Sequence, residues 1–108
     1  MDYTKAQGTR PEVDLELMRL APKYVWWESP EVAIRRPERI IAQVMNIGDF
    51  DDVQTMVSIV GDDVLRDILA NAEIGQFNAR SWHYWHYRLE LARFGEIPVP
   101  PMPARRTR

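Results

Sequence analysis

The sequence predicts a small all-α protein, a single-domain bundle of about five helices. Apolar residues recur at spacings of three and four in several segments, and glycine or proline marks the ends of those segments. No segment alternates apolar and polar residues as a half-buried strand would. The 108 residues, 45% of them hydrophobic and 28% charged, are enough for one domain with one modest core.

The first quarter of the chain is the least regular part. Residues 1–10 are expected to form a flexible N-terminus, and Pro11 is placed to open a short helix over residues 11–20. Residues 21–27 contain Pro22 among bulky side chains, so we expect an irregular, extended arm there, lying on the core. The helical domain as a whole is predicted to span residues 11–95.

Proline and serine mark the next two helices. Ser29 is a good N-cap for a short helix, which should end near Arg36 because Pro37 disfavours helical geometry in the residue before it. Pro37 itself suits the first turn of a helix over residues 38–47. The apolar residues of that helix are Ile40, Ile41, Val44, Met45 and Ile47.

Aspartates mark the following two helices, where their charge favours the positive end of the helix dipole. Asp49 should cap a helix whose apolar stripe is Phe50, Val53, Met56, Val57 and Val60. Asp62 should begin a second helix with an apolar stripe of Val64, Leu65, Ile68, Leu69 and Ala72. Four glycines stand where helical patterns stop and are expected to adopt left-handed backbone geometry: Gly48, Gly61, Gly75 and Gly95.

The last predicted helix begins at Asn78 and runs to Phe94. Beyond it, residues 96–108 contain four prolines and three arginines, which predicts an extended, solvated tail in the polyproline conformation. Within it, the letters PPMPAR fit the P-x-x-P-x-R pattern of ligands for SH3-type grooves, although four prolines near a terminus match that pattern easily.

The last helix has two different apolar faces. One face is formed by Trp82, Trp85, Leu89 and Ala92. The other is formed by Tyr84, Tyr87, Leu91 and Phe94. The plain interpretation is a central helix that neighbours cover on both sides. The alternative is that one face is core and the other a binding surface, because the remaining short helices cannot cover so much ring area.

Exposed tyrosine, tryptophan and arginine are typical of the residues that dominate the affinity of protein interfaces. The candidate partner-binding residues are therefore aromatic or basic residues of the last helix, the arm and the tail. They are Trp26, Trp27, Arg80, Tyr84, Tyr87, Arg88, Arg105 and Arg106.

The same helix allows two weaker chemical interpretations. His83, His86 and Glu90 fall within an arc of about 60°, but histidines at the rim of such a helix are more often packed or solvated than metal-bound. Arg80 and His86 have the R-x5-H spacing that resembles the ribonuclease signature of HEPN domains, in which the histidine helps to activate a ribose hydroxyl. We expect no catalytic residue, metal or cofactor, and keep a HEPN-like ribonuclease as the second alternative.

Charge bears on a further alternative, a helix-turn-helix-like DNA-binding regulator built from residues 49–72. Residues 49–78 contain seven acids and one base, whereas residues 79–108 contain six bases and two acids. Only Arg66 and Asn71 could read bases in the predicted second helix, and its aspartates would repel phosphate. The basic C-terminal end could attract either a nucleic acid or an acidic protein face.

Cysteine is absent and no apolar run approaches the length needed to span a bilayer, so we expect a cytoplasmic protein with no membrane contact. Neither observation identifies a partner.

The residues from Leu17 to Leu91 are similar to small bacterial proteins encoded next to nucleotidyltransferases of the AbiEii/AbiGii toxin type. The shared features are LAPKYVWWESPEVAI, an I-x-x-V-M-x-x-G turn, an acidic cap before an amphipathic helix, G-D-D-x-L-R and S-W-x-Y-W. No catalytic motif accompanies that family. The resemblance implies an antitoxin, or an accessory partner, of a nucleotidyltransferase toxin in a toxin-antitoxin or phage-defence pair. Together with the aromatic and basic residues described above, the resemblance predicts that the helical domain presents Tyr84, Tyr87 and Arg88, with Trp26 or Trp27, to an acidic enzyme. The arginine tail would then lie toward the nucleotide cleft, and binding would block entry of substrate or tRNA.

Overall fold

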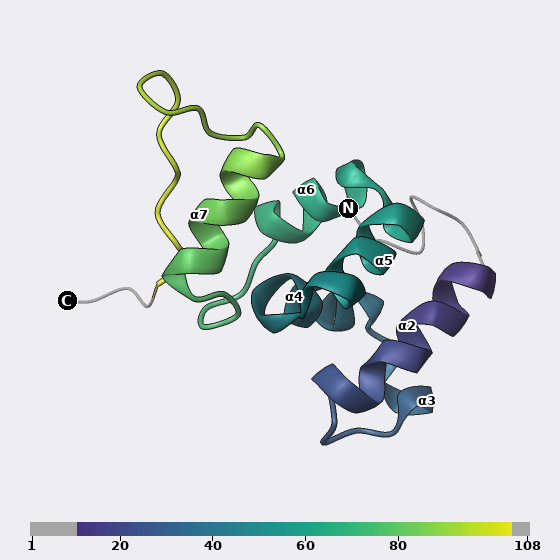
Figure 1. The fold of residues 1–108 in the computed structure, drawn as a ribbon. Coiled ribbons are helices and arrows are strands. Elements are labelled where there is room, and N and C mark those ends of the chain that lie inside the picture. The colour runs from purple at the N-terminus through teal and green to yellow at the C-terminus, as the bar shows by residue number, and fades with distance from the viewer. Residues whose placement is uncertain (1–10, 105–108) are drawn as a thin grey trace.

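A computed structural model describes residues 11–104, and within that range all regular structure is helical apart from one isolated bridge pair (Figure 1). The predicted all-α fold is confirmed. The helices are α2 (Pro11–Tyr24), α3 (Pro30–Ala33), α4 (Pro37–Ile47), α5 (Phe50–Val60), α6 (Asp62–Ala70) and α7 (Ala79–Arg88). Over this part of the chain, no helix is long and apolar enough to cross a membrane.

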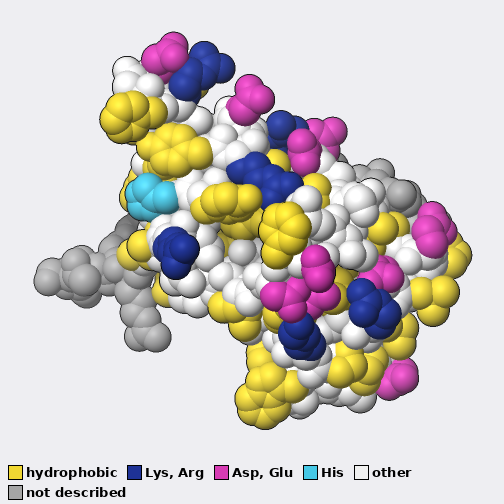
Figure 2. Space-filling model, viewed as in Figure 1, with side chains coloured by type: hydrophobic (Ala, Val, Ile, Leu, Met, Phe, Trp, Pro, Cys, Tyr) yellow, Lys and Arg dark blue, Asp and Glu magenta, His cyan; other side chains and the backbone are white. Residues whose placement is uncertain are grey.

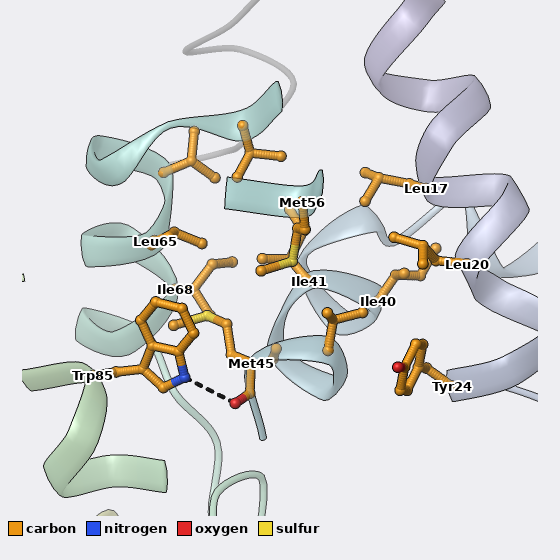
Figure 3. Packing of buried hydrophobic residues seen from close by; sticks show 14 of the residues in the cluster. Leu17, Leu20, Tyr24, Ile40, Ile41, Met45, Met56, Leu65, Ile68 and Trp85 are labelled. Atoms are coloured by element: carbon orange, nitrogen blue, oxygen red, sulfur yellow. Dashed lines mark hydrogen bonds between the residues drawn. The ribbon is translucent and has the colours of Figure 1, made fainter. Parts of the chain in front are cut away.

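The centre of the fold is α4, which packs against α2, α3, α5, α6 and α7. Its buried residues point in several directions, so the helix is apolar on more than one side: Ile40, Ile41, Ala42, Val44 and Met45. Figure 3 shows Leu17 of α2 and Trp85 of α7 approaching this helix from different sides. The interpretation of the aromatic α7 as the central helix is therefore wrong, because α4 occupies that place.

The side chains of α7 complete the C-terminal end of α4, where backbone carbonyls lack helical partners. The indole Nε1 of Trp85 donates to the Met45 carbonyl at 2.8 Å (Figure 3), and the Ser81 hydroxyl donates to the Asn46 carbonyl at 2.7 Å. In return, the Asn46 side chain accepts a hydrogen bond from the Asn78 backbone N–H at 2.9 Å. These bonds fix the position of α7 on the core.

The predicted extended arm needs a correction, because α2 continues as a helix through Tyr24. Pro22 lies in its last turn, and it has no backbone N–H to donate to the carbonyl four residues earlier, which is why the sequence favoured an earlier end. Tyr24 is buried, and its hydroxyl reaches α5, so tertiary packing extends the helix beyond its local preference. Only the turn that follows, which contains Trp26 and Trp27, is irregular.

A polar cluster joins the end of α2 to the start of α5. The Tyr24 hydroxyl donates to Asp52 Oδ2 at 2.7 Å and accepts from the Asp49 backbone N–H at 3.1 Å. The Lys23 ammonium donates to both Asp49 and Asp52. Hydrogen bonds from Lys23 and from the Asp52 backbone lower the pKa of Asp49, and hydrogen bonds from Tyr24 and Lys23 lower the pKa of Asp52. Hydrogen bonds to the two aspartates raise the pKa of Lys23, while burial, followed by the bond to Asp52, raises the pKa of Tyr24.

Acid should therefore weaken the fold as the pH drops through the lowered pKa values of Asp49 and Asp52, below their usual 3.8. A carboxyl group whose pKa falls on folding stabilises the folded state above its unfolded pKa, and this contribution is lost as the folded-state pKa is crossed. Urea unfolding at a series of pH values from about 6 to about 2 measures the slope. Asp52→Asn should flatten it, and an unchanged slope in that variant would contradict the assignment.

Lys23 and Tyr24 act in the opposite sense, since their contributions are lost as the pH rises beyond about 10.

The glycine predictions are right at three positions and wrong at one. Gly61, Gly75 and Gly95 have φ values of 83°, 79° and 78°. Gly48 has an ordinary extended backbone, with φ −66° and ψ 148°. It is required for close packing instead, because a Cβ atom there would lie 2.4 Å from the Val44 carbonyl oxygen.

The last helix is shorter than predicted, since α7 ends at Arg88 and not at Phe94. Glu90 adopts a left-handed conformation with φ 60°, and its N–H donates to the Tyr87 carbonyl at 3.1 Å. The next N–H, of Leu91, donates to the His86 carbonyl at 2.9 Å. This is the Schellman arrangement with glutamate in the position that glycine usually takes.

The C-terminal segment also differs from the predicted solvated tail. The backbone turns back at residues 93–97, where the Arg93 N–H donates to the Ile97 carbonyl at 2.7 Å and the Ile97 N–H to the Arg93 carbonyl at 2.8 Å. Residues 98–104 then run beside α7 (Figure 1, yellow beside green). The Trp82 indole donates to the Pro100 carbonyl at 2.7 Å, so this segment is extended but packed on the domain.

Candidate functional site

The two faces of α7 have different environments. Trp82, Trp85, Leu89 and Ala92 are buried in or against the core, whereas Tyr84 and Tyr87 are 52% and 41% exposed. The alternative in which one face is core and the other is free therefore matches the packing of this chain. Figure 2 shows hydrophobic and basic side chains side by side over the region of α7.

The exposed face is ordered by Arg88, whose guanidinium lies beside two neighbouring rings. Its carbon is 5.9 Å from the Tyr84 ring centroid and 5.0 Å from that of Trp85. Nη1 donates to the Tyr84 hydroxyl at 3.0 Å, and Nη2 lies 3.4 Å from Oε1 of Gln54 on α5. Tyr84 in turn meets the buried Trp85 edge to face at 5.2 Å. Tyr84, Tyr87 and Arg88, with Gln54, are called the α7 surface below.

One neighbour of this surface corrects a sequence prediction. Phe50 was expected on the buried stripe of its helix, but it is 76% exposed. It begins α5 one turn before Gln54, so both lie on the side of α5 that faces solvent. The sequence does not show which way an apolar residue at the first position of a helix points. It also gives no indication that Gln54 lies on this surface.

Trp26 and Trp27 form a separate exposed pair. They lie in the turn after α2, and their rings meet edge to face at 5.5 Å. Trp27 also lines a hollow of about 420 Å³ with residues of α4 and of the loop before α7, among them Arg39, Gln43 and Ile74. No residue of the α7 surface lines this hollow, and the structure does not bring the tryptophans onto that surface.

The remaining predicted interface residues divide into two cases. Arg80 lies exposed in the first turn of α7 and makes no hydrogen bond or ion pair with residues 11–104. Arg105 and Arg106 lie outside the described residues.

The two histidines of α7 occupy different environments. His86 is only 4% exposed; its Nδ1 lies 2.7 Å from the Trp82 carbonyl oxygen, and its ring packs on the Trp82 ring at 4.3 Å. His83 is exposed, with Nδ1 2.8 Å from the Ala79 carbonyl oxygen. No group of three metal-ligating side chains forms between Pro11 and Ala104. The exposed Arg80 and the buried His86, the pair with HEPN-like spacing, therefore do not share one open site.

The helices of the DNA-binding alternative, α5 and α6, pack on the core and on each other. Arg66, a candidate base reader, donates to the Leu89 carbonyl at 3.2 Å and to Asp63 at 3.0 Å. The Asn71 side chain donates to the Asp67 carbonyl at 2.9 Å. Both candidate side chains thus have partners inside the protein, which does not favour direct readout of bases.

Comparisons with protein-family models, with curated proteins and with solved structures find no match to this chain. The features that bear on function are therefore the α7 surface and the resemblance of residues 17–91.

Proposed function

We propose that this chain is a non-enzymatic protein-binding module that acts in the cytoplasm as the antitoxin, or accessory partner, of an AbiEii/AbiGii-type nucleotidyltransferase toxin. The single observation that carries the binding role is the ordered pair of Arg88 and Tyr84, joined by a 3.0 Å hydrogen bond on an exposed face. The resemblance of the sequence supplies the class of partner.

The α7 surface has the properties of an interface centre. Tyrosine and arginine are enriched among residues that carry binding energy, and they bind best where they are already ordered. Trp85 is buried beneath Arg88 and Tyr84 and supports both of them. A partner that covers this surface therefore loses little side-chain entropy on binding.

Charge supports the class of partner. Arg88 and the tail arginines belong to the basic third of the chain, and a metal-binding nucleotidyltransferase presents an acidic cleft. In this proposal the α7 surface docks beside the cleft, and the tail, which includes Arg105 and Arg106, extends toward it. Entry of a nucleotide or of tRNA is then blocked sterically.

Co-expression with an AbiEii/AbiGii-type nucleotidyltransferase from the same organism tests the proposal. We expect a stable complex on size exclusion and loss of the enzyme's activity. Absence of a complex at micromolar concentrations of both proteins would reject the proposal. Replacing Arg105 and Arg106 by alanine in the full chain should retain binding but weaken inhibition, while full inhibition would exclude the tail from the mechanism.

A gel shift with DNA from upstream of its own gene separates this proposal from the DNA-binding alternative. We expect no specific retention at either of two salt concentrations, because α6 is acidic and its candidate base readers are engaged. Specific retention that persists at the higher salt concentration would favour a regulator.

A further inference from the structure

A second site lies on the other side of α7, between that helix, α6 and the C-terminal segment. It is a hollow of about 570 Å³ lined mainly by apolar side chains. Trp82, His86 and Leu91 line it together with Leu69 and Ala72. Pro100, Pro101 and Pro103 lie along it.

We propose that this hollow, here called the proline groove, is a recognition site for proline-rich segments in the polyproline conformation. The chain's own residues 99–103 form one side of it, with the Pro100 carbonyl on the Trp82 indole, and a proline-rich segment of another protein competes with them for that position. This inference does not depend on the identity of the enzyme proposed above.

The segment is held at the groove through a backbone carbonyl and an aromatic ring. Backbone carbonyls of a polyproline helix have no internal hydrogen-bond partners, and grooves that bind such helices supply aromatic walls. Here the Trp82 indole N–H donates to the Pro100 carbonyl at 2.7 Å. The Trp82 ring is fixed between Phe77 at 5.8 Å and His86 at 4.3 Å, so the donor is held in place before the segment arrives.

The groove also contains a polar atom of His86 that has no partner among residues 11–104. The Trp82 carbonyl can only accept, so Nδ1 of the buried His86 must be the donor in their 2.7 Å contact. In the neutral imidazole Nε2 is then an acceptor, and it makes no hydrogen bond with residues 11–104. A buried acceptor without a donor is unfavourable, and a ligand backbone N–H from a residue between two prolines would satisfy it.

The chain's own segment lines the groove without filling it. It leaves the hollow unfilled and His86 Nε2 without a donor, and Pro100 and Pro101 remain exposed. Two short backbone bonds between Arg93 and Ile97 close the turn before it, so the segment can detach without unfolding α7. A ligand in trans that fills the hollow and also accepts the Trp82 indole N–H can therefore displace the segment.

The test uses a chain that ends at Ile97 and a synthetic peptide of residues 98–108, with titration calorimetry as the readout. We expect saturable binding to the shortened chain and binding to the full chain weakened about tenfold or more, because the tethered segment competes at a high effective concentration. A peptide with Pro100, Pro101 and Pro103 replaced by alanine should not bind. No binding to the folded, shortened chain, or equal binding of the two peptides, would overturn the proposal.

Two further variants keep the test decisive if the shortened chain does not fold. The full chain with the same three prolines replaced by serine retains its length but competes poorly, and it should bind the natural peptide. In that background Trp82→Phe, which removes the indole N–H and keeps a ring, should weaken peptide binding about five- to tenfold. The matched control His83→Ala, on an exposed position of the same helix, should leave it unchanged, and equal effects of the two substitutions would contradict the assignment of the donor.

Discussion

Replacing Trp85 by alanine should lower the free energy of unfolding by about 3–5 kcal/mol, which is the largest loss that we expect from any single substitution in the described core. The side chain is 1% exposed and is the largest of the fully buried ones. Its removal leaves a cavity between α7 and α4 and leaves the Met45 carbonyl without its donor. For a domain of this size, each kcal/mol shifts the melting temperature by about 4–8 °C.

Thermal and urea unfolding of matched variants measure the effect. Trp85→Phe keeps a ring in the core and removes only the indole hydrogen bond and part of the volume, so its loss should be clearly smaller. His83→Ala changes an exposed residue two positions away and should have almost no effect. A melting temperature for Trp85→Ala within a few degrees of the natural chain would show that α7 does not depend on this contact.

Replacing both Tyr84 and Tyr87 by alanine should weaken binding to the proposed nucleotidyltransferase partner by about 2 kcal/mol or more for each residue that is a hot spot, or about 30-fold each. The effect should appear mainly as faster dissociation. Because both side chains are partly exposed, the fold should remain intact, which circular dichroism and the melting temperature would verify.

Two controls separate the parts of this surface. Tyr84→Phe keeps the ring and removes only the hydroxyl that accepts from Arg88, so it reports on the ordering of the guanidinium. Trp26 lies on a separate exposed turn, so the affinity of Trp26→Ala shows whether the tryptophan pair also contacts the partner. Unchanged affinity of the double tyrosine variant, with an intact fold, would reject the α7 surface as the docking site.

The helix starts could be predicted because they depend on local chemistry. Ser29, Asp49 and Asn78 each accept a hydrogen bond from a backbone N–H three residues on, as expected for N-caps. The C-terminal ends of the helices were harder to predict than their starts. Helix α2 runs past Leu20 because a buried tyrosine finds partners on a helix far along the chain, and no local pattern contains that information.

The candidate site was predictable in part for the same reason. The periodicity of α7 separates its tryptophans from Tyr84 and Tyr87, and their burial follows that division. The sequence could not show that Gln54 reaches Arg88 or that Phe50 turns outward, because both depend on how α5 crosses α7. The seating of Pro100 on Trp82 was missed as well, since proline-rich sequence alone favours a solvated segment.

The carbonyl groups at the C-terminal end of α4 obtain their hydrogen-bond donors late in the synthesis of the protein. A ribosome releases α4 well before Ser81 and Trp85, the residues that satisfy those carbonyls. Until they emerge, the nascent chain has an uncapped central helix and an open core. The same late segment carries Tyr84 and Arg88, so the residues of the α7 surface leave the ribosome together with the residues that complete the core.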